Sequence, residues 1–284
     1  MQLLSGPVRS TRWLGAAFAA ACLLAGLGGC VHEGPPLPKT PRGASADGGD
    51  IATASDQTQA DRLAATRLSL ASAYFFDRKQ PRDALDEVKL ALAARPNYPD
   101  AYDLRGLIYA QLNDPAIAEQ SFQRARELAP HEGGWMHDYA WFLCGQKRYP
   151  EADAEFTRAM AEPGYTGQAR TLLAQGVCEA RAGHMADAER TLLKAYEQDP
   201  ANPVTAYNLA DVLYVNGQYD RARFYIRRIN SKDELVSAQS LWLAARIEHK
   251  SGQADQVREL GAQLHKRFPQ SAEAAAFDRG RFDE

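Results

Sequence analysis

The chain lacks several features that would place it quickly in a class. Its 284 residues hold 33 lysines and arginines against 36 acidic residues, so there is no basic excess to neutralise nucleic-acid phosphates. No apolar run reaches the roughly 20 residues of a membrane-spanning helix. Four cysteines are too few for a disulfide-rich small domain. These absences argue against a nucleic-acid-binding protein, an integral membrane protein and a disulfide-stapled mini-domain.

Motifs of enzyme chemistry are also missing. The six histidines form no H-E-x-x-H motif, and His131-Glu132 is followed by Gly133-Gly134-Trp135 without a second histidine. The sequence has no phosphate-binding glycine loop and no G-x-S-x-G elbow. We therefore expect a protein that is not an enzyme, with no cofactor, no metal site and no small-molecule substrate.

The first thirty residues have the form of an export signal. Arg9 and Arg12 precede a short apolar stretch over residues 14–29. The junction Leu27-Gly28-Gly29-Cys30 resembles the bacterial lipobox, in which the cysteine is lipidated and becomes the mature N-terminus. We predict a lipoprotein signal peptide over residues 1–29 and lipidation of Cys30. The alternative is an ordinary signal peptide with an incidental cysteine.

The segment after this junction is poor in large apolar residues. Residues 30–61 contain four prolines, followed by Gly43, Gly48 and Gly49, a composition that cannot bury enough surface to offset the entropy of ordering. We predict a flexible tether. Val31 follows Cys30, and by resemblance to Gram-negative lipoproteins the lack of an aspartate there implies sorting to the outer membrane, with the folded part in the periplasm.

The rest of the chain is repetitive. Alanines recur at spacings of 34, 34, 36 and 34 residues, at Ala84, Ala118, Ala152, Ala188 and Ala222. A bulky apolar residue stands four positions after each, at Val88, Phe122, Phe156, Leu192 and Ile226. This period, with prolines closing several units, is the signature of the tetratricopeptide repeat. An irregular helical bundle is the alternative.

The period predicts an all-α tetratricopeptide superhelix of about six helix-turn-helix repeats over residues 62–277. The sixth unit is weaker, because Gly261 stands where the other units have a bulky residue. We expect a short capping helix over residues 271–277 and a frayed C-terminus over residues 278–284.

Two cysteines fall within this repeat domain. Cys144 and Cys178 lie on the expected first helices of the third and fourth units, which should be neighbours. The sequence leaves two alternatives, a disulfide or two separate buried thiols.

Without catalytic motifs, binding is the expected activity. The first helices of such arrays line the concave surface, and the repeat register places seven residues there as a candidate partner-binding surface: Phe76, Leu107, Trp141, Val177, Tyr207, Asp211 and Tyr214. Aromatic residues in a groove suit a peptide or helix of a partner protein. Some of these residues become core if the register is wrong by one position. Four arginines at 221, 223, 227 and 228 form either a solvated helix face or a docking site for an acidic partner.

Several stretches resemble one family. They are Tyr139–Cys144, Pro163-Gly-Tyr165, Gly176–Ala180, Ser240–Glu248 and Arg267–Ser271. Together with the lipobox they resemble the type IV pilus biogenesis lipoproteins PilF and PilW, the pilotins of the pilus secretin. Ala140, where a glycine is usual, and a longer tether are the departures.

This resemblance implies an outer-membrane lipoprotein that binds secretin subunits and promotes their outer-membrane localisation and multimerisation. The competing interpretation is a tetratricopeptide lipoprotein of the β-barrel assembly machinery or another periplasmic scaffold.

Overall fold

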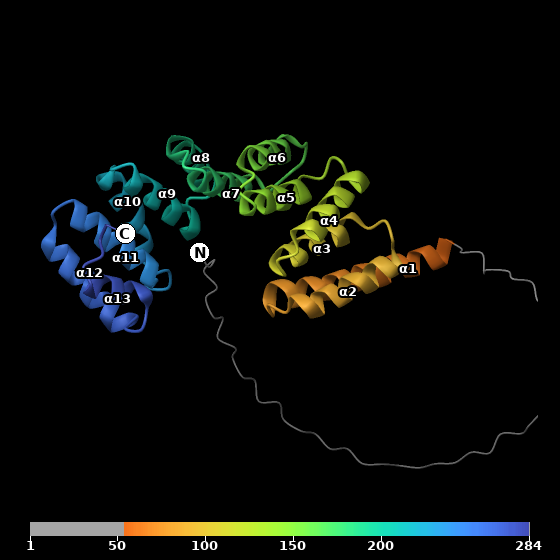
Figure 1. The fold of residues 1–284 in the computed structure, drawn as a ribbon, viewed down its shortest axis with the longest axis horizontal. Helices are drawn as coiled ribbons and strands as arrows, with labels where there is room; N and C mark the ends of the chain where they lie inside the picture. Colours follow the sequence, from red (N-terminus) through yellow and green to blue (C-terminus); the bar gives the residue numbers. More distant parts are fainter. Residues whose placement is uncertain (1–53, 284) are drawn as a thin grey trace, which may run out of the picture. The chain divides into compact units, whose positions relative to one another are not determined.

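The computed structural model describes residues 54–283; the predicted signal peptide, Cys30 and most of the predicted tether lie outside that range. Within it, the chain consists of helices and connecting turns (Figure 1). Six helix pairs follow one another, so the predicted all-α repeat architecture is confirmed. The first helices are α1 (Ala54–Ser72, followed by the π-helical turn η1, Ala73–Asp77), α3 (Pro99–Gln111), α5 (Gly133–Gly145), α7 (Gln168–Arg181), α9 (Pro203–Val215) and α11 (Ala238–Lys250). The second helices are α2 (Pro81–Ala94), α4 (Pro115–Leu128), α6 (Tyr149–Ala161), α8 (Met185–Gln198), α10 (Tyr219–Asn230) and α12 (Ala254–Arg267), and α13 (Ala272–Asp278) follows them.

The turn inside each pair has the same backbone conformation. One residue per turn has positive φ: Lys79, Asn113, Lys147, Gly183, Gly217 and Gly252. In the second turn, the following residue, Asp114, donates its N–H to the Tyr109 carbonyl at 2.9 Å. That bond satisfies a carbonyl at the end of the first helix and reverses the chain for the second.

The two helices of a pair cross where the sequence places its small residues. Ala84, Ala118, Ala152, Ala188 and Ala222 are all completely buried. At the second crossing a Cβ on Gly106 would lie 2.7 Å from Phe122 Cζ, and at the fourth a Cβ on Gly176 would lie 2.7 Å from Leu192 Cγ. A small residue at each crossing therefore makes room for the bulky side chain opposite it.

Cys144 on α5 and Cys178 on α7 form a disulfide, with their Cα atoms 5.8 Å apart. Both residues are buried in the central core cluster, which also contains Phe122, Phe142 and Phe156. The sequence left open either a disulfide or two separate buried thiols, and the structure has the disulfide.

The spacing of 36 residues between Ala152 and Ala188, two longer than the others, has a structural role. The loop between α6 and α7 carries Tyr165, whose ring lies so close to Gly133 that a Cβ there would be 2.7 Å from Tyr165 Cδ2. The Tyr165 hydroxyl lies 2.7 Å from Thr171 Oγ1, and His137 Nδ1 lies 2.9 Å from the same atom. The extra residues thus complete a small polar network between α5 and α7.

Two predicted boundaries are wrong. Helix α1 begins at Ala54 rather than at residue 62, and its later turns are held to α2 by Arg67 and Glu87 (Nη1–Oε2 3.0 Å). The C-terminal segment is not frayed, because Phe282 packs against other aromatic side chains. The predicted capping helix is confirmed as α13.

Candidate partner-binding surface

The candidate surface is the face of the first helices that points away from the second helices. Figure 1 shows α5 and α7 on the inner side of the curved stack, with α6 and α8 outside them. Because the six pairs repeat the same geometry, equivalent residues of successive first helices follow one another along this face. We call this face of the six first helices the first-helix surface. The seven residues that the sequence assigned to it are Phe76, Leu107, Trp141, Val177, Tyr207, Asp211 and Tyr214.

The N-terminal part of the first-helix surface is the more open. Phe76, in η1, is 51% exposed, and its ring meets the buried ring of Phe75 edge-on at 4.9 Å between centroids. Leu107 is partly buried and packs against both the N-terminal and the central core clusters. An exposed aromatic ring on a rigid base is a suitable anchor for a partner.

Trp141 lies at the centre of the surface and is partly buried against the central core. The guanidinium carbon of Arg181 stands 4.7 Å from the centroid of its ring, a cation–π contact. The sequence analysis did not single out Arg181. It stands on the next first helix, α7, so no local sequence pattern marked it.

Val177 does not contribute to this surface. It is 9% exposed, so it has almost no area to offer a partner. Its expected role is therefore corrected to a packing role. The physical reason is the helical period, since a shift of one position turns a side chain by about 100° around the helix.

The three C-terminal candidates lie together on α9 beside Arg246 of α11. Burial, and then the charge of Asp211, raise the pKa of Tyr207 to about 12. Burial also raises the pKa of Asp211, while Arg246 acts in the opposite direction. Tyr214 is only 7% exposed, and the Arg246 guanidinium lies 4.5 Å from its ring centroid. Tyr214 is thus covered rather than free, which corrects the expectation of an open site.

Two buried carboxyl groups, of Asp103 and Asp138, lie beneath the central part of the surface. Burial, and then the neighbouring charge of Asp138, raise the pKa of Asp103 well above its usual range. Asp103 Oδ1 is buried without a hydrogen-bond partner. Burial also raises the pKa of Asp138, while the charge of Arg170 lowers it. Sequence reasoning missed this pair, although Asp103 stands one helical turn before Leu107.

His137 stands one turn before Trp141 and is buried in the network with Thr171 and Tyr165. Burial, and secondarily Arg170, lower the pKa of His137 to about 3. The ring is therefore neutral at physiological pH and serves as a hydrogen-bonding core residue.

The arginines of α10 have partners within the chain. Arg223 Nε and Arg227 Nη2 contact the same oxygen of the buried Glu248, at 2.9 and 3.0 Å. Arg221 pairs with Glu189, and Arg228 lies over the ring of Tyr196. These internal contacts favour a structural role for the four arginines over docking of an acidic partner.

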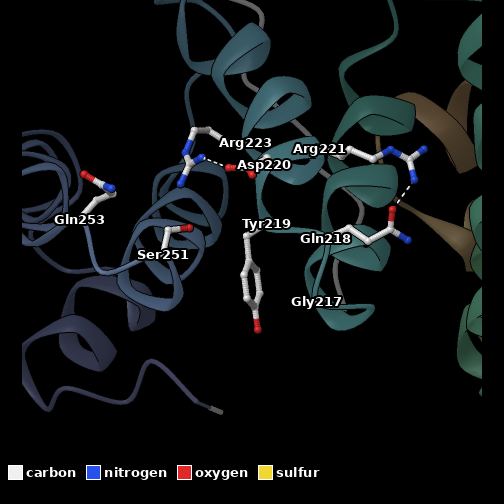
Figure 2. Close-up of a pocket in the computed structure, with 8 residues that line it drawn as sticks. All are labelled: Gly217, Gln218, Tyr219, Asp220, Arg221, Arg223, Ser251 and Gln253. Carbon is white, nitrogen blue, oxygen red and sulfur yellow. Dashed lines mark hydrogen bonds and ion pairs between the residues drawn. The ribbon is translucent and has the colours of Figure 1, made fainter.

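A separate hollow of about 540 Å³ lies where the turn between α9 and α10 faces the turn between α11 and α12 (Figure 2). Figure 2 shows Asp220 paired with Arg223 and Gln218 with Arg221, so these four polar side chains of the lining are bonded to one another in pairs. Tyr219 stands between these pairs.

Residues 54–283 contain no group of metal-ligating side chains and no helix that could span a membrane. Over residues 54–283, no three His, Cys, Asp or Glu side chains are grouped so as to hold a metal ion. None of the helices in that range has both the length and the hydropathy of a membrane span.

Comparison with known proteins agrees with this geometry. Residues 99–132 and 179–241 match models of the tetratricopeptide repeat. The chain is 25% identical over 203 residues to the type IV pilus assembly protein PilF of Pseudomonas aeruginosa, a match that spans 72% of this chain and 80% of that protein.

Two solved structures have the same arrangement of repeats. The crystal structure of PilW, described as a widely conserved type IV pilus biogenesis factor, is 30% identical and has a TM-score of 0.70, with 76% of this chain and 98% of that chain covered. The structure of Pseudomonas aeruginosa PilF is 23% identical with a TM-score of 0.67, and covers 78% and 99%. The match to PilW covers nearly the whole length of that protein, and the chain belongs to the PilF/PilW family of tetratricopeptide type IV pilus biogenesis factors.

Proposed function

We propose that this protein is the pilotin of a type IV pilus secretin. In this role it is an outer-membrane lipoprotein, anchored through Cys30, whose repeat domain lies in the periplasm. It binds secretin subunits and promotes their localisation to the outer membrane and their assembly into the ring through which the pilus passes. Family membership and the lipobox-like junction Leu27–Cys30 support this proposal.

The observation that carries the binding part is the open N-terminal half of the first-helix surface. Phe76 is half exposed, and Trp141 and Leu107 present partly buried apolar faces on neighbouring first helices. Each rests on a packed core, so little conformational entropy is lost when a partner covers it. The C-terminal half is less accessible, because Tyr214 is covered.

The anchoring part is tested in cells that produce the full chain. Stable membrane attachment requires more than one acyl chain, which lipoprotein processing supplies at a cysteine. In a strain without the endogenous protein, we expect the wild type to restore secretin multimers in the outer-membrane fraction and twitching motility. Cys30→Ser should fractionate away from the outer membrane and leave the secretin there reduced.

Cys22→Ser is the matched control, because Cys22 lies within the predicted signal peptide and should be dispensable. If Cys30→Ser is still found in the outer membrane, Cys30 is not the anchor. If secretin multimers form normally without the protein, the pilotin role is wrong.

A further inference from the structure

The C-terminal tail, residues 279–283, folds back onto the first helices of the last two repeats. After α13 the chain turns through Gly280, which has φ of +64°, and the N–H of Arg281 bonds the Ala276 carbonyl at 3.1 Å. This turn directs Phe282 toward α9 and α11. The hydrogen bond from Tyr214 to Phe282 joins residues 68 positions apart in the sequence.

The ring of Phe282 is held by aromatic side chains. It stacks on the His249 ring, with centroids 4.3 Å apart and planes inclined by 13°. The Trp242 ring lies 5.2 Å away and the Phe277 ring 5.5 Å away. The Phe282 ring therefore lies among aromatic groups. Such a site binds an apolar side chain because it buries apolar surface and allows favourable ring–ring orientations.

The backbone and the acidic group of the tail are also recognised. The Phe282 carbonyl accepts hydrogen bonds from the Tyr214 hydroxyl at 3.2 Å and from Arg246 Nε at 3.3 Å. Lys250 forms an ion pair with Asp283. A side-chain ring, a main-chain carbonyl and a following carboxylate thus each meet a complementary group on two neighbouring first helices.

These contacts fall on the first-helix surface. Trp242, Arg246 and Lys250 succeed one another at intervals of one helical turn on α11, and Tyr214 is the last candidate residue of α9. Asp211 and Tyr207 continue the same face beside Arg246. The tail therefore occupies the place that a bound peptide would take on this face.

We propose that the first-helix surface of the fifth and sixth repeats is a peptide-binding site, that the protein's own tail is its resident ligand, and that a partner segment of the same chemistry replaces the tail. That chemistry is an extended segment with an aromatic residue followed by an acidic one. The proposal does not depend on the identity of the pilus partner.

Replacement is physically reasonable for this segment. Residues 279–283 follow α13 and belong to none of the six helix pairs, so their departure leaves those pairs in place. His249 and Lys250 are exposed at the side of the site, and the Asp283 side chain is 72% exposed in its ion pair, so solvent weakens that contact. A short tether gives the tail an effective concentration in the millimolar range, so a partner peptide binds the wild type weakly until the tail is released.

The test uses the full chain and a fluorescein-labelled synthetic peptide with the sequence of residues 279–284, followed by fluorescence anisotropy. Phe282→Ala weakens the resident tail and leaves the site itself intact. We expect Phe282→Ala to bind the peptide at least about tenfold more tightly than the wild type does. A peptide with alanine in place of its phenylalanine should not bind.

Two further variants assign the binding to this surface. Adding Arg246→Ala or His249→Ala to Phe282→Ala should abolish binding of the peptide. Adding Phe224→Ala, on the exposed face of α10, should not change it. Circular dichroism and melting of each variant show that loss of binding is not loss of folding.

Three outcomes overturn the proposal. If Phe282→Ala is folded but does not bind the peptide, the surface is not a peptide-binding site. Equal binding by the wild type and Phe282→Ala means that the tail is not its resident ligand. A dimer of the wild type that Phe282→Ala abolishes, seen by sedimentation, means that the tail occupies the site of a second copy. None of these measurements involves the secretin, so the proposal fails or stands separately from the pilotin role.

Discussion

The ring of Phe277, on the short helix α13, occupies the space above Gly261 of α12. A Cβ on Gly261 would lie 2.1 Å from Phe277 Cζ. In the second and fourth repeats the equivalent residues, Phe122 and Leu192, provide the bulky group themselves. The last repeat instead receives its bulky side chain from the capping helix, and this explains why its sequence signature is weak.

Gly261→Leu should therefore expel Phe277 and loosen α13. We expect a loss of about 1–3 kcal/mol in the free energy of unfolding, typical of overpacking. Chemical denaturation measures this loss. Ala262→Leu is the control, because Ala262 is exposed on the same helix and should change stability little. Equal effects of the two substitutions would contradict the packing described for Phe277.

The disulfide predicts a dependence of stability on redox state. Cys144 and Cys178 are 34 residues apart in the sequence, and closing a loop of that length is worth about 3–4 kcal/mol in the chain-entropy model, less any strain. Reductant should lower the melting temperature of the wild type. It should not affect the double variant Cys144→Ala, Cys178→Ala. Two thiols reacting with Ellman's reagent in the denatured, unreduced mature protein would show that the bond is absent.

His137 predicts a loss of stability in acid. Its pKa in the folded protein is about 3, whereas an unperturbed histidine has a pKa of about 6.5. The unfolded chain therefore binds a proton that the folded chain does not between these two values. The contribution of His137 is complete above pH 6.5 and falls by up to about 1.4 kcal/mol per pH unit as the pH decreases toward 3.

His137→Gln removes this titration and keeps a hydrogen-bonding group near Thr171. We expect its free energy of unfolding to depend less on pH between 4 and 6 than that of the wild type, measured by denaturant titration at several pH values. His184→Gln, at an exposed position, should retain the wild-type slope. Identical slopes for His137→Gln and the wild type would mean that His137 is protonated in the folded protein.

The repeat architecture could be predicted because it rests on short, recurring patterns. Ala152 and Phe156 are four residues apart, and the same pair recurs in each of the first five units, so the sequence defines the helix crossing repeatedly. The two boundaries that were wrong have no such repetition. Residues 54–61 are polar and lack helical apolar periodicity, yet they continue α1.

The site was predictable only in part, for a related reason. The register placed Trp141 and Tyr207 on first helices, where both are partly buried. One-residue differences in helical phase nevertheless decide whether a side chain such as Val177 is core. Tyr214 is contacted by Arg246 and by the Phe282 carbonyl, and contacts between residues so distant in sequence leave no local pattern. The contact of Arg181 with the Trp141 ring could not be predicted for the same reason.

The central claim is that the first-helix surface binds the secretin, and binding of purified secretin periplasmic domain to full-length variants tests it most directly. Phe76→Ala and Trp141→Ala each remove an aromatic group from the open half of the surface. Aromatic anchors are often worth 2 kcal/mol or more, which corresponds to about a thirtyfold rise in Kd. Phe76 is 51% exposed, so its loss should leave the melting temperature nearly unchanged.

Phe224→Ala is the matched control, because Phe224 is 61% exposed on a second helix. Calorimetry and thermal melting on the same samples separate loss of binding from loss of folding. The account predicts a Kd raised about thirtyfold for Phe76→Ala or Trp141→Ala and unchanged for Phe224→Ala. Wild-type Kd values for both Phe76→Ala and Trp141→Ala in folded protein would contradict it.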